Sequence, residues 1–202
     1  FPYTTLFRSE YHKGKCGVEN QANGVNFWLQ IPIYEEKNKY FIEINDDWWW
    51  LKDGKSYLFT SEKNGYRHLY LYSLDGTKKT QVTHGNFEVT EVNGVDEKHR
   101  LIYYTKAYPR PMDRNLFVTD FDGNNTRQLT EGEAWHRVSL NKDFSKFYDF
   151  SSDINSPQSI TLNSIEYNNG TVNVSKEKTV DEGNKMKVKM DEYSYGKAEF
   201  IR

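Results

Sequence analysis

The 202-residue sequence predicts an all-β chain, a partial β-propeller of about three and a half four-stranded antiparallel blades. The first observation that predicts it is the stretch Asp53–Gly85, in which turn sequences separate short runs rich in aromatic and β-branched residues. The strands expected there are Ser56–Ser61, His68–Leu74 and Lys79–Thr83. Asp75-Gly76 lies between the last two strands and readily supplies the positive φ angles of a tight type I′ hairpin turn.

The second observation is that the same unit recurs after 47 residues. The matched positions are Leu69 with Leu116, Tyr70 with Phe117, Leu71 with Val118, Asp75-Gly76 with Asp122-Gly123, Gln81 with Gln128, Val82 with Leu129, Thr83 with Thr130 and Gly85 with Gly132. A period of about 40 to 50 residues with about four short strands per unit is typical of β-propeller blades. The repeat therefore predicts the fold class, and its period predicts the blade boundaries given below.

Composition supports a twisted antiparallel sheet and excludes some functions. The chain has 15 Tyr, 12 Phe and 5 Trp, residue types that favour strands. Its 27 basic and 29 acidic residues are evenly spread, which argues against a nucleic-acid partner. No apolar run approaches the roughly 18 residues of a membrane span. Cys16 is the only cysteine, so no intrachain disulfide can form.

The repeat divides the chain into segments. Residues 1–9 are similar to a translated sequencing adapter, which predicts a metagenomic fragment whose natural sequence starts near Glu10. The partial propeller is expected over 10–179, with blades at roughly 10–45, 46–86, 87–132 and 133–179. Residues 180–202 form a charged stretch that predicts a connecting segment rather than a helix.

The candidate catalytic and metal-binding residues fit ordinary structural roles better than chemistry. The five histidines, His12, His68, His84, His99 and His136, stand alone without metal-ligand spacing. Asp120–Asn124 resembles part of a calcium loop but lacks its downstream ligands, and it repeats the Asp75-Gly76 turn. We therefore expect neither a metal nor a cofactor.

Two further motifs are weak candidates for an active site. Ser194 lies in Glu192–Gly196, a near match to the G-x-S-x-G nucleophile elbow in which Glu replaces the first Gly. Glu35-Glu36 could bind a substrate amine, but it is interpreted as a solvated turn between two strands. We therefore predict no catalytic residue in this chain.

Residues 25–202 resemble the later part of the N-terminal β-propeller of dipeptidyl peptidase IV-like serine exopeptidases, which belong to the prolyl oligopeptidase clan. The segments that carry the resemblance are FIEINDDWWWLKDGK at 41–55, TSEKNGYRHLYLY at 60–72, QVTHGNFEVTEVNGVD at 81–96, RNLFVT at 114–119, Ser151-Ser152, Ser156-Pro157 and 197–202. The last of these resembles the approach to the family's C-terminal α/β-hydrolase domain.

The resemblance implies a parent enzyme that removes N-terminal dipeptides with a Ser–His–Asp triad in that hydrolase domain. The propeller would gate and help to position the peptide substrate, and its partners would be the hydrolase domain of the same chain and the peptide. A homodimeric parent and a periplasmic or extracellular location are also implied. The amine-binding glutamate pair of the family normally lies in an earlier blade, so that role is not assigned to Glu35-Glu36. The alternative is a stand-alone β-propeller that serves as a binding scaffold.

Overall fold

The computed structural model describes residues 15–21, 24–30, 48–168, 170–193, 196 and 198. The chain divides into two compact units, Phe1–Asp46 and Asp47–Arg202. In the first unit, β1 (Lys15–Gln21) pairs antiparallel with β2 (Gly24–Gln30). Residues 31–45 of the blade expected at 10–45 lie outside the described residues.

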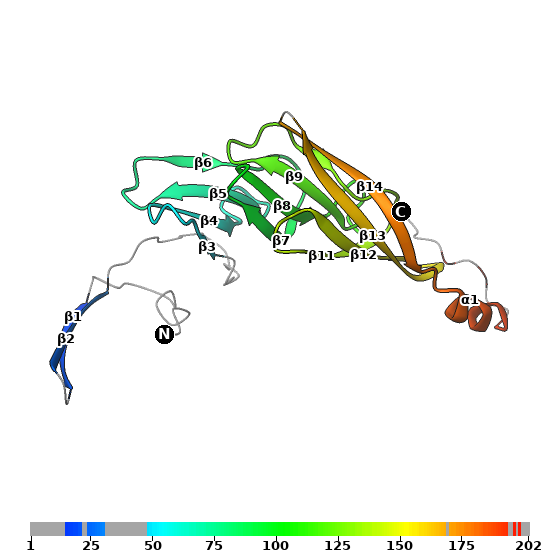
Figure 1. Ribbon diagram of the computed structural model, residues 1–202, viewed down its shortest axis with the longest axis horizontal. Coiled ribbons are helices and arrows are strands. Elements are labelled where there is room, and N and C mark those ends of the chain that lie inside the picture. Colours follow the sequence, from blue (N-terminus) through cyan, green and yellow to red (C-terminus); the bar gives the residue numbers. More distant parts are fainter. Residues whose placement is uncertain are drawn as a thin grey trace. The chain divides into compact units, whose positions relative to one another are not determined.

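The second unit contains three four-stranded antiparallel sheets, each a simple meander (Figure 1). The first is β3 (Trp48–Trp50), β4 (Ser56–Ser61), β5 (His68–Ser73) and β6 (Lys79–Gln81). The second is β7 (Val89–Asp96), β8 (Leu101–Lys106), β9 (Asn115–Asp120) and β10 (Arg127–Gln128). The third is β11 (Trp135–Leu140), β12 (Lys146–Asp153), β13 (Ser156–Asn168) and β14 (Thr171–Asp181). These sheets confirm the predicted all-β partial propeller.

Two hydrophobic cores hold the three sheets together. The first core joins the facing sides of the first two sheets and includes Leu58, Leu69, Val82, Ile102, Tyr104 and Phe117. The second joins the second and third sheets and includes Tyr103, Leu116, Val118, Phe147, Ile165 and Val172. Successive residues of a strand point to opposite faces, so β8 sends Ile102 and Tyr104 into one core and Tyr103 into the other. The second sheet is therefore buried on both faces.

The repeated Gln-apolar-Thr sequence has a structural cause. Just after the last strand of the first sheet, the backbone N–H of Leu69 donates to Thr83 Oγ1 at 3.0 Å. In the second sheet, the N–H of Leu116 donates to Thr130 Oγ1 at the same distance. The Gln81 and Gln128 side chains each donate to the carbonyl of the threonine two residues later. After each short last strand ends, the threonine side chain thus continues the hydrogen bonding to the neighbouring third strand of the sheet.

We expect Thr130→Val to lower the free energy of unfolding by about 1–3 kcal/mol, because the buried N–H of Leu116 would lose its acceptor while the shape is kept. The exposed Thr77, which lies in a turn of the first sheet, is the matched control, and Thr77→Val should cost much less. Urea unfolding of both variants tests this expectation. Equal costs would mean that the buried hydroxyl contributes nothing beyond a surface threonine.

The predicted turn type at Asp75-Gly76 is wrong, although the hairpin is present. A type I′ turn needs positive φ at both central residues, but only Gly76 is left-handed, with φ 71°. The loop is longer than two residues: Gly76 N donates to Ser73 O, and Ser73 N donates to Lys78 O. Asp75 Oδ1 accepts a hydrogen bond from Thr77 N at 3.0 Å, and such an Asx contact stabilises the turn without requiring a left-handed Asp.

A second repeated feature is found in the loop between the first and second strands of each four-stranded sheet. Gly54, Arg100 and Phe144 occupy corresponding places and are all left-handed, with φ of 62°, 56° and 56°. The first and third loops close identically, since Gly54 N donates to Leu51 O and Phe144 N donates to Asn141 O. Their spacings of 46 and 44 residues match the blade period, which extends the repeat to the third sheet.

The charged stretch after β14 contains a helix, contrary to the prediction. The helix α1 (Asn184–Asp191) follows a left-handed Gly183 and buries none of its residues. The stretch was predicted to be non-helical because it lacks the apolar face that marks a packed surface helix. No helix among the described residues is long and apolar enough to cross a membrane.

Candidate functional site

Polar and aromatic side chains gather at one end of the three sheets, which we call the loop end. It is the end at which each sheet passes from its second to its third strand, through 62–67, 107–114 and 154–155. Because β14 is antiparallel to β13, the chain also leaves the third sheet at this end and enters α1.

An arginine is rigidly held at the loop end by a buried carboxylate. Arg110 donates from Nε and from its second terminal nitrogen to the two oxygens of Asp113, at 2.9 and 2.7 Å. Its other terminal nitrogen pairs with Glu133 at 2.8 Å. Asp113 is almost fully buried, and the hydrogen bonds from Arg110 hold the pKa of its carboxyl below the usual value. The pair fixes the loop between β8 and β9.

A second polar pair links β11 to β12 nearby. His136 Nδ1 lies 2.9 Å from both oxygens of Asp149, and both residues are buried. His136 Nε2 has no hydrogen-bond partner among the described residues. The ring of the preceding Trp135 is exposed and stacks with the Arg114 guanidinium, whose carbon lies 4.6 Å from the ring centroid.

A lysine ammonium is enclosed by aromatic rings at the end of β8. Lys106 Nζ lies 3.9 Å from the centroid of Phe117, 4.1 Å from that of Phe87 and 4.8 Å from that of Tyr108. The residue is only 7% exposed, and burial lowers the pKa of its amine from 10.5 to about 8. Cation–π attraction to the three rings offsets part of the cost of burying the charge.

This lysine should make stability depend on pH. Its folded pKa of about 8 lies below the unfolded value of 10.5, so the unfolded chain holds more protons between these values. Stability therefore rises with pH across that window, and the full cost of the buried charge is present below pH 8. We expect Lys106→Met to be more stable than the wild type at pH 7, with the difference shrinking by about 1–2 kcal/mol between pH 8 and 10.5.

Urea unfolding of both proteins at pH 7, 8.5 and 10 measures that difference. Subtracting the variant from the wild type cancels the titration of the other groups. A difference that stays constant with pH would show that the amine is solvated like a surface lysine.

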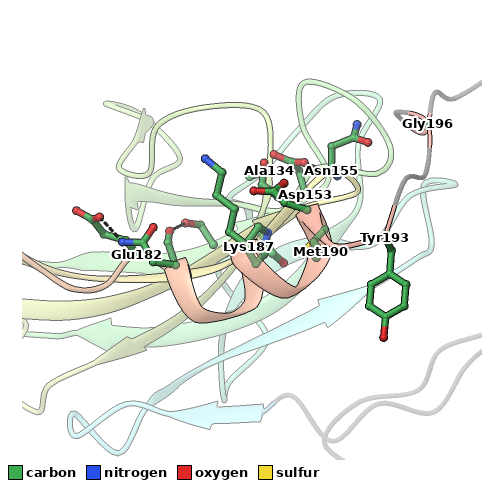
Figure 2. Close-up of a pocket in the computed structure, with 15 residues that line it drawn as sticks. Ala134, Asp153, Asn155, Glu182, Lys187, Met190, Tyr193 and Gly196 are labelled. Carbon is green, nitrogen blue, oxygen red and sulfur yellow. Dashed lines mark hydrogen bonds between the residues drawn. The ribbon is translucent and has the colours of Figure 1, made fainter.

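A groove of about 770 Å³ lies between the third sheet and α1 (Figure 2). Its sheet side is formed by Ser151, Ser152, Asp153, Asn155, Ser156, Pro157 and Ser159, and its helix side by residues that include Glu182, Lys187 and Met190. Asn155 also holds the chain beyond α1, because its amide donates to Ala198 O at 3.0 Å and accepts from Ala198 N at 2.9 Å. Polar and apolar side chains therefore share the lining of the groove, and charges of both signs border it.

Large apolar side chains project from the same end. The exposed ones are Tyr66, Tyr108, Trp135 and Ile154, together with Tyr193 just after α1. Tyr193 is 71% exposed and points away from the helix (Figure 2). Each of the three sheets contributes at least one such residue.

The structure gives the described histidines structural surroundings. His68 is buried, with one ring nitrogen 3.0 Å from Thr83 Oγ1 and the other 3.1 Å from Gly85 O, and burial lowers its pKa. His99 Nδ1 lies 2.6 Å from Asp96, at the opposite end of the sheets. His84 is exposed, and His12 lies outside the described residues. Nowhere in the described part of the chain do three potential metal ligands cluster.

The remaining candidates are not brought together either. Asp120 Oδ1 accepts the N–H groups of Asp122 and Asn124, which is the geometry of a hairpin turn. Ser194 and Glu35-Glu36 lie outside the described residues. The element before Ser194 is the helix α1, whereas a nucleophile elbow follows a strand.

Sequence reasoning missed Lys106, the Arg110–Asp113 pair and the His136–Asp149 pair. Their partners lie in loops and neighbouring strands at irregular separations of 2 to 19 residues, so no periodic pattern marks them. These groups bind and orient one another. The arrangement can therefore recognise a ligand or a neighbouring domain.

The three four-stranded sheets define the class of this chain as a portion of a β-propeller. The chain belongs to the family described as Dipeptidyl peptidase IV (DPP IV) N-terminal region, whose sequence profile matches residues 6–158.

Individual relatives agree with this assignment. Dipeptidyl peptidase 4 of Arthroderma otae is 38% identical over 71 residues, which are 35% of this chain and 9% of that protein. Dipeptidyl peptidase 4 of Trichophyton tonsurans is 36% identical over 108 residues, 53% of this chain and 12% of that protein. The crystal structure of Porphyromonas gingivalis dipeptidyl peptidase 4 shares the fold, with a TM-score of 0.71 over 88% of this chain and 25% of that chain at 20% identity. The chain thus spans only a small part of each relative.

Proposed function

We propose that this chain is the non-catalytic propeller portion of a dipeptidyl peptidase IV-like serine peptidase that removes N-terminal dipeptides. Catalysis belongs to an α/β-hydrolase domain of the same protein, and the loop end faces that domain. There it gates access and helps to position the peptide. The family match supports the assignment of the parent as a peptidase. The role of the loop end is supported by the location of the groove, α1 and the exposed apolar residues at this same end.

The observation that carries the proposed role is the asymmetry between the two ends of the sheets. The loop end collects a groove, a helix without buried residues and five exposed large apolar side chains. An eight-residue helix is marginal on its own in water, so α1 gains stability when a partner covers it. A surface of this kind fits a neighbouring domain with a peptide between the two.

The test uses the whole protein encoded by the same gene, assayed with a chromogenic Xaa-Pro dipeptide substrate and with longer peptides. We expect turnover by the whole protein and none by the 202-residue chain. Trp135→Ala and Ile154→Ala should change kcat/KM several-fold, with a larger effect on longer peptides. Leu74→Ala is the matched control, because Leu74 is similarly exposed at the opposite end.

The outcomes separate the parts of the proposal. A whole protein without peptidase activity would favour the alternative, a stand-alone propeller that serves as a binding scaffold. If the whole protein is active but the loop-end variants behave like Leu74→Ala, the parent is a peptidase as proposed. The proposal that this end gates access and positions the peptide would then be rejected. Turnover by the 202-residue chain itself would contradict the non-catalytic assignment.

A further inference from the structure

Lys106 is placed unlike the other lysines of the described chain. Most of these are exposed, whereas Lys106 is 7% exposed and ends a strand that is buried along its whole length. Its backbone pairs with Val89 on one side and Asn115 on the other, which fixes the start of the side chain. The ammonium therefore occupies a set position rather than sampling solvent.

The three rings around the ammonium are themselves held in place. Phe87 contacts the ring of His68 edge-on at a centroid distance of 5.1 Å. Tyr108 packs edge-on against Phe117, and the Asn115 amide donates to the carbonyl of Tyr108 at 2.7 Å. The cage is thus assembled from the linker before β7, the loop after β8 and β9.

The cage offers the ammonium no acceptor. A lysine ammonium has three N–H donors, and no carboxylate among the described residues pairs with this one. The ionisable groups that face it are His68, whose pKa its charge helps to lower, and the hydroxyl of Tyr108. The nearby Glu88 carboxylate accepts the N–H of Arg67 at 3.2 Å instead. Burial without an acceptor favours the neutral amine.

The amine nevertheless keeps contact with solvent. Nζ of Lys106 is not among the fully buried side-chain polar atoms that lack a hydrogen bond in the described part of the chain. The ring of Tyr108, which forms one wall of the cage, is itself 47% exposed. The side of the cage formed by Tyr108 is therefore the one from which a small reagent would approach the nitrogen.

We propose that Lys106 is a modification site of this chain, at which the ε-amine takes an acyl group from small activated donors such as acyl phosphates. The nitrogen lone pair attacks the acyl carbon, the bond from that carbon to the phosphate oxygen breaks, and phosphate leaves with the bonding electrons. The nitrogen then loses one proton to water. The product is a neutral amide, which removes the buried charge and leaves a planar group among the rings.

The test treats the 202-residue chain with acetyl phosphate at several pH values from 6.5 to 10.5 and measures acetylation of each lysine by peptide mass spectrometry. We expect Lys106 at pH 7.5 to react about tenfold faster than the exposed Lys78 and Lys98, because a larger fraction of its amine is neutral. Its rate should level off above about pH 8, where the amine is mostly deprotonated. In guanidinium chloride, which unfolds the chain, Lys106 should react no faster than Lys78 and Lys98.

Tyr108→Ser opens the cage at its exposed wall and provides a second measurement. We expect the plateau of the Lys106 profile to move to higher pH in this variant, while Lys78 and Lys98 react as before. The proposal is overturned if Lys106 is unreactive, if it reacts no faster than those two lysines, or if its rate rises in parallel with theirs to pH 10.5. A profile unchanged by Tyr108→Ser would also overturn the role of the cage.

Discussion

Gly123→Ala should destabilise the chain by about 2–4 kcal/mol, whereas Gly76→Ala should cost about 1 kcal/mol. Both glycines occupy the same place in consecutive hairpins and are left-handed, with φ of 81° and 71°. The strain of placing a side chain at positive φ is therefore common to both variants.

The difference comes from what surrounds each turn. A Cβ atom on Gly123 would lie 2.3 Å from the carbonyl oxygen of Val82, whereas one on Gly76 would meet nothing within 4 Å. Val82 is buried and its N–H donates to Leu69 O at 2.8 Å, so its backbone cannot move aside without breaking the edge of the first sheet. The turn of the second sheet therefore needs glycine for space as well as for conformation.

Urea unfolding of the two alanine variants measures both costs, and Gly76→Ala serves as the matched control for left-handed strain. If the variants lose equal stability, the turn around Gly123 does not pack against the first sheet. A smaller cost at Gly123 than at Gly76 would contradict the packing of consecutive blades outright.

The sequence predicted the parts of the fold that depend on local chemistry. The Gln-apolar-Thr motif recurs because it satisfies the same backbone groups in both repeats. The two Asp-Gly turns share a left-handed glycine whose N–H donates to the carbonyl three residues earlier, so the same residue types are needed in both. The repeat through Gly54, Arg100 and Phe144 was not recognised, because only its first member is glycine. Left-handed strain of about 1 kcal/mol is small enough for packing to offset, and the residue type can then change.

The groups of the loop end could not be predicted for a different reason. Lys106 is the last residue of a mostly apolar strand, a position at which a charged residue normally marks the end of the buried segment. Its burial depends on Phe87 and Phe117, which lie 19 residues before it and 11 after it. Arg110 and Asp113 flank a proline in a loop, a pattern typical of a solvated turn. Contacts of this kind are set by tertiary packing rather than by periodicity.

Gly94→Ala should cost about 1–3 kcal/mol in the wild-type chain and close to nothing once Phe144 is replaced by glycine. Gly94 lies at an irregularity of β7 and is the cross-strand partner of Tyr103. A Cβ atom on Gly94 would lie 2.6 Å from Cε1 of Phe144, whose ring stacks on Tyr103 at a centroid distance of 5.2 Å. An aromatic ring from the third sheet thus covers a glycine of the second.

The ring of Phe144 cannot simply rotate away from an added methyl group. It is stacked almost parallel to Tyr103, with an interplanar angle of 6°, and packs against the second core. Phe144→Gly alone relieves the left-handed strain but loses this packing, so we expect a net loss of about 2 kcal/mol. With the ring removed, the methyl group that Gly94→Ala introduces has room in the vacated space.

Urea unfolding of the wild type, the two single variants and the double variant closes a double-mutant cycle. We expect a coupling energy of about 1–3 kcal/mol, in the direction that makes the double variant more stable than the sum of its parts. Additive losses would mean that Gly94 and Phe144 do not touch. In that case the second core would not extend to the hairpin between β11 and β12, and the third sheet would be held by Phe147, Ile165 and Val172 without it.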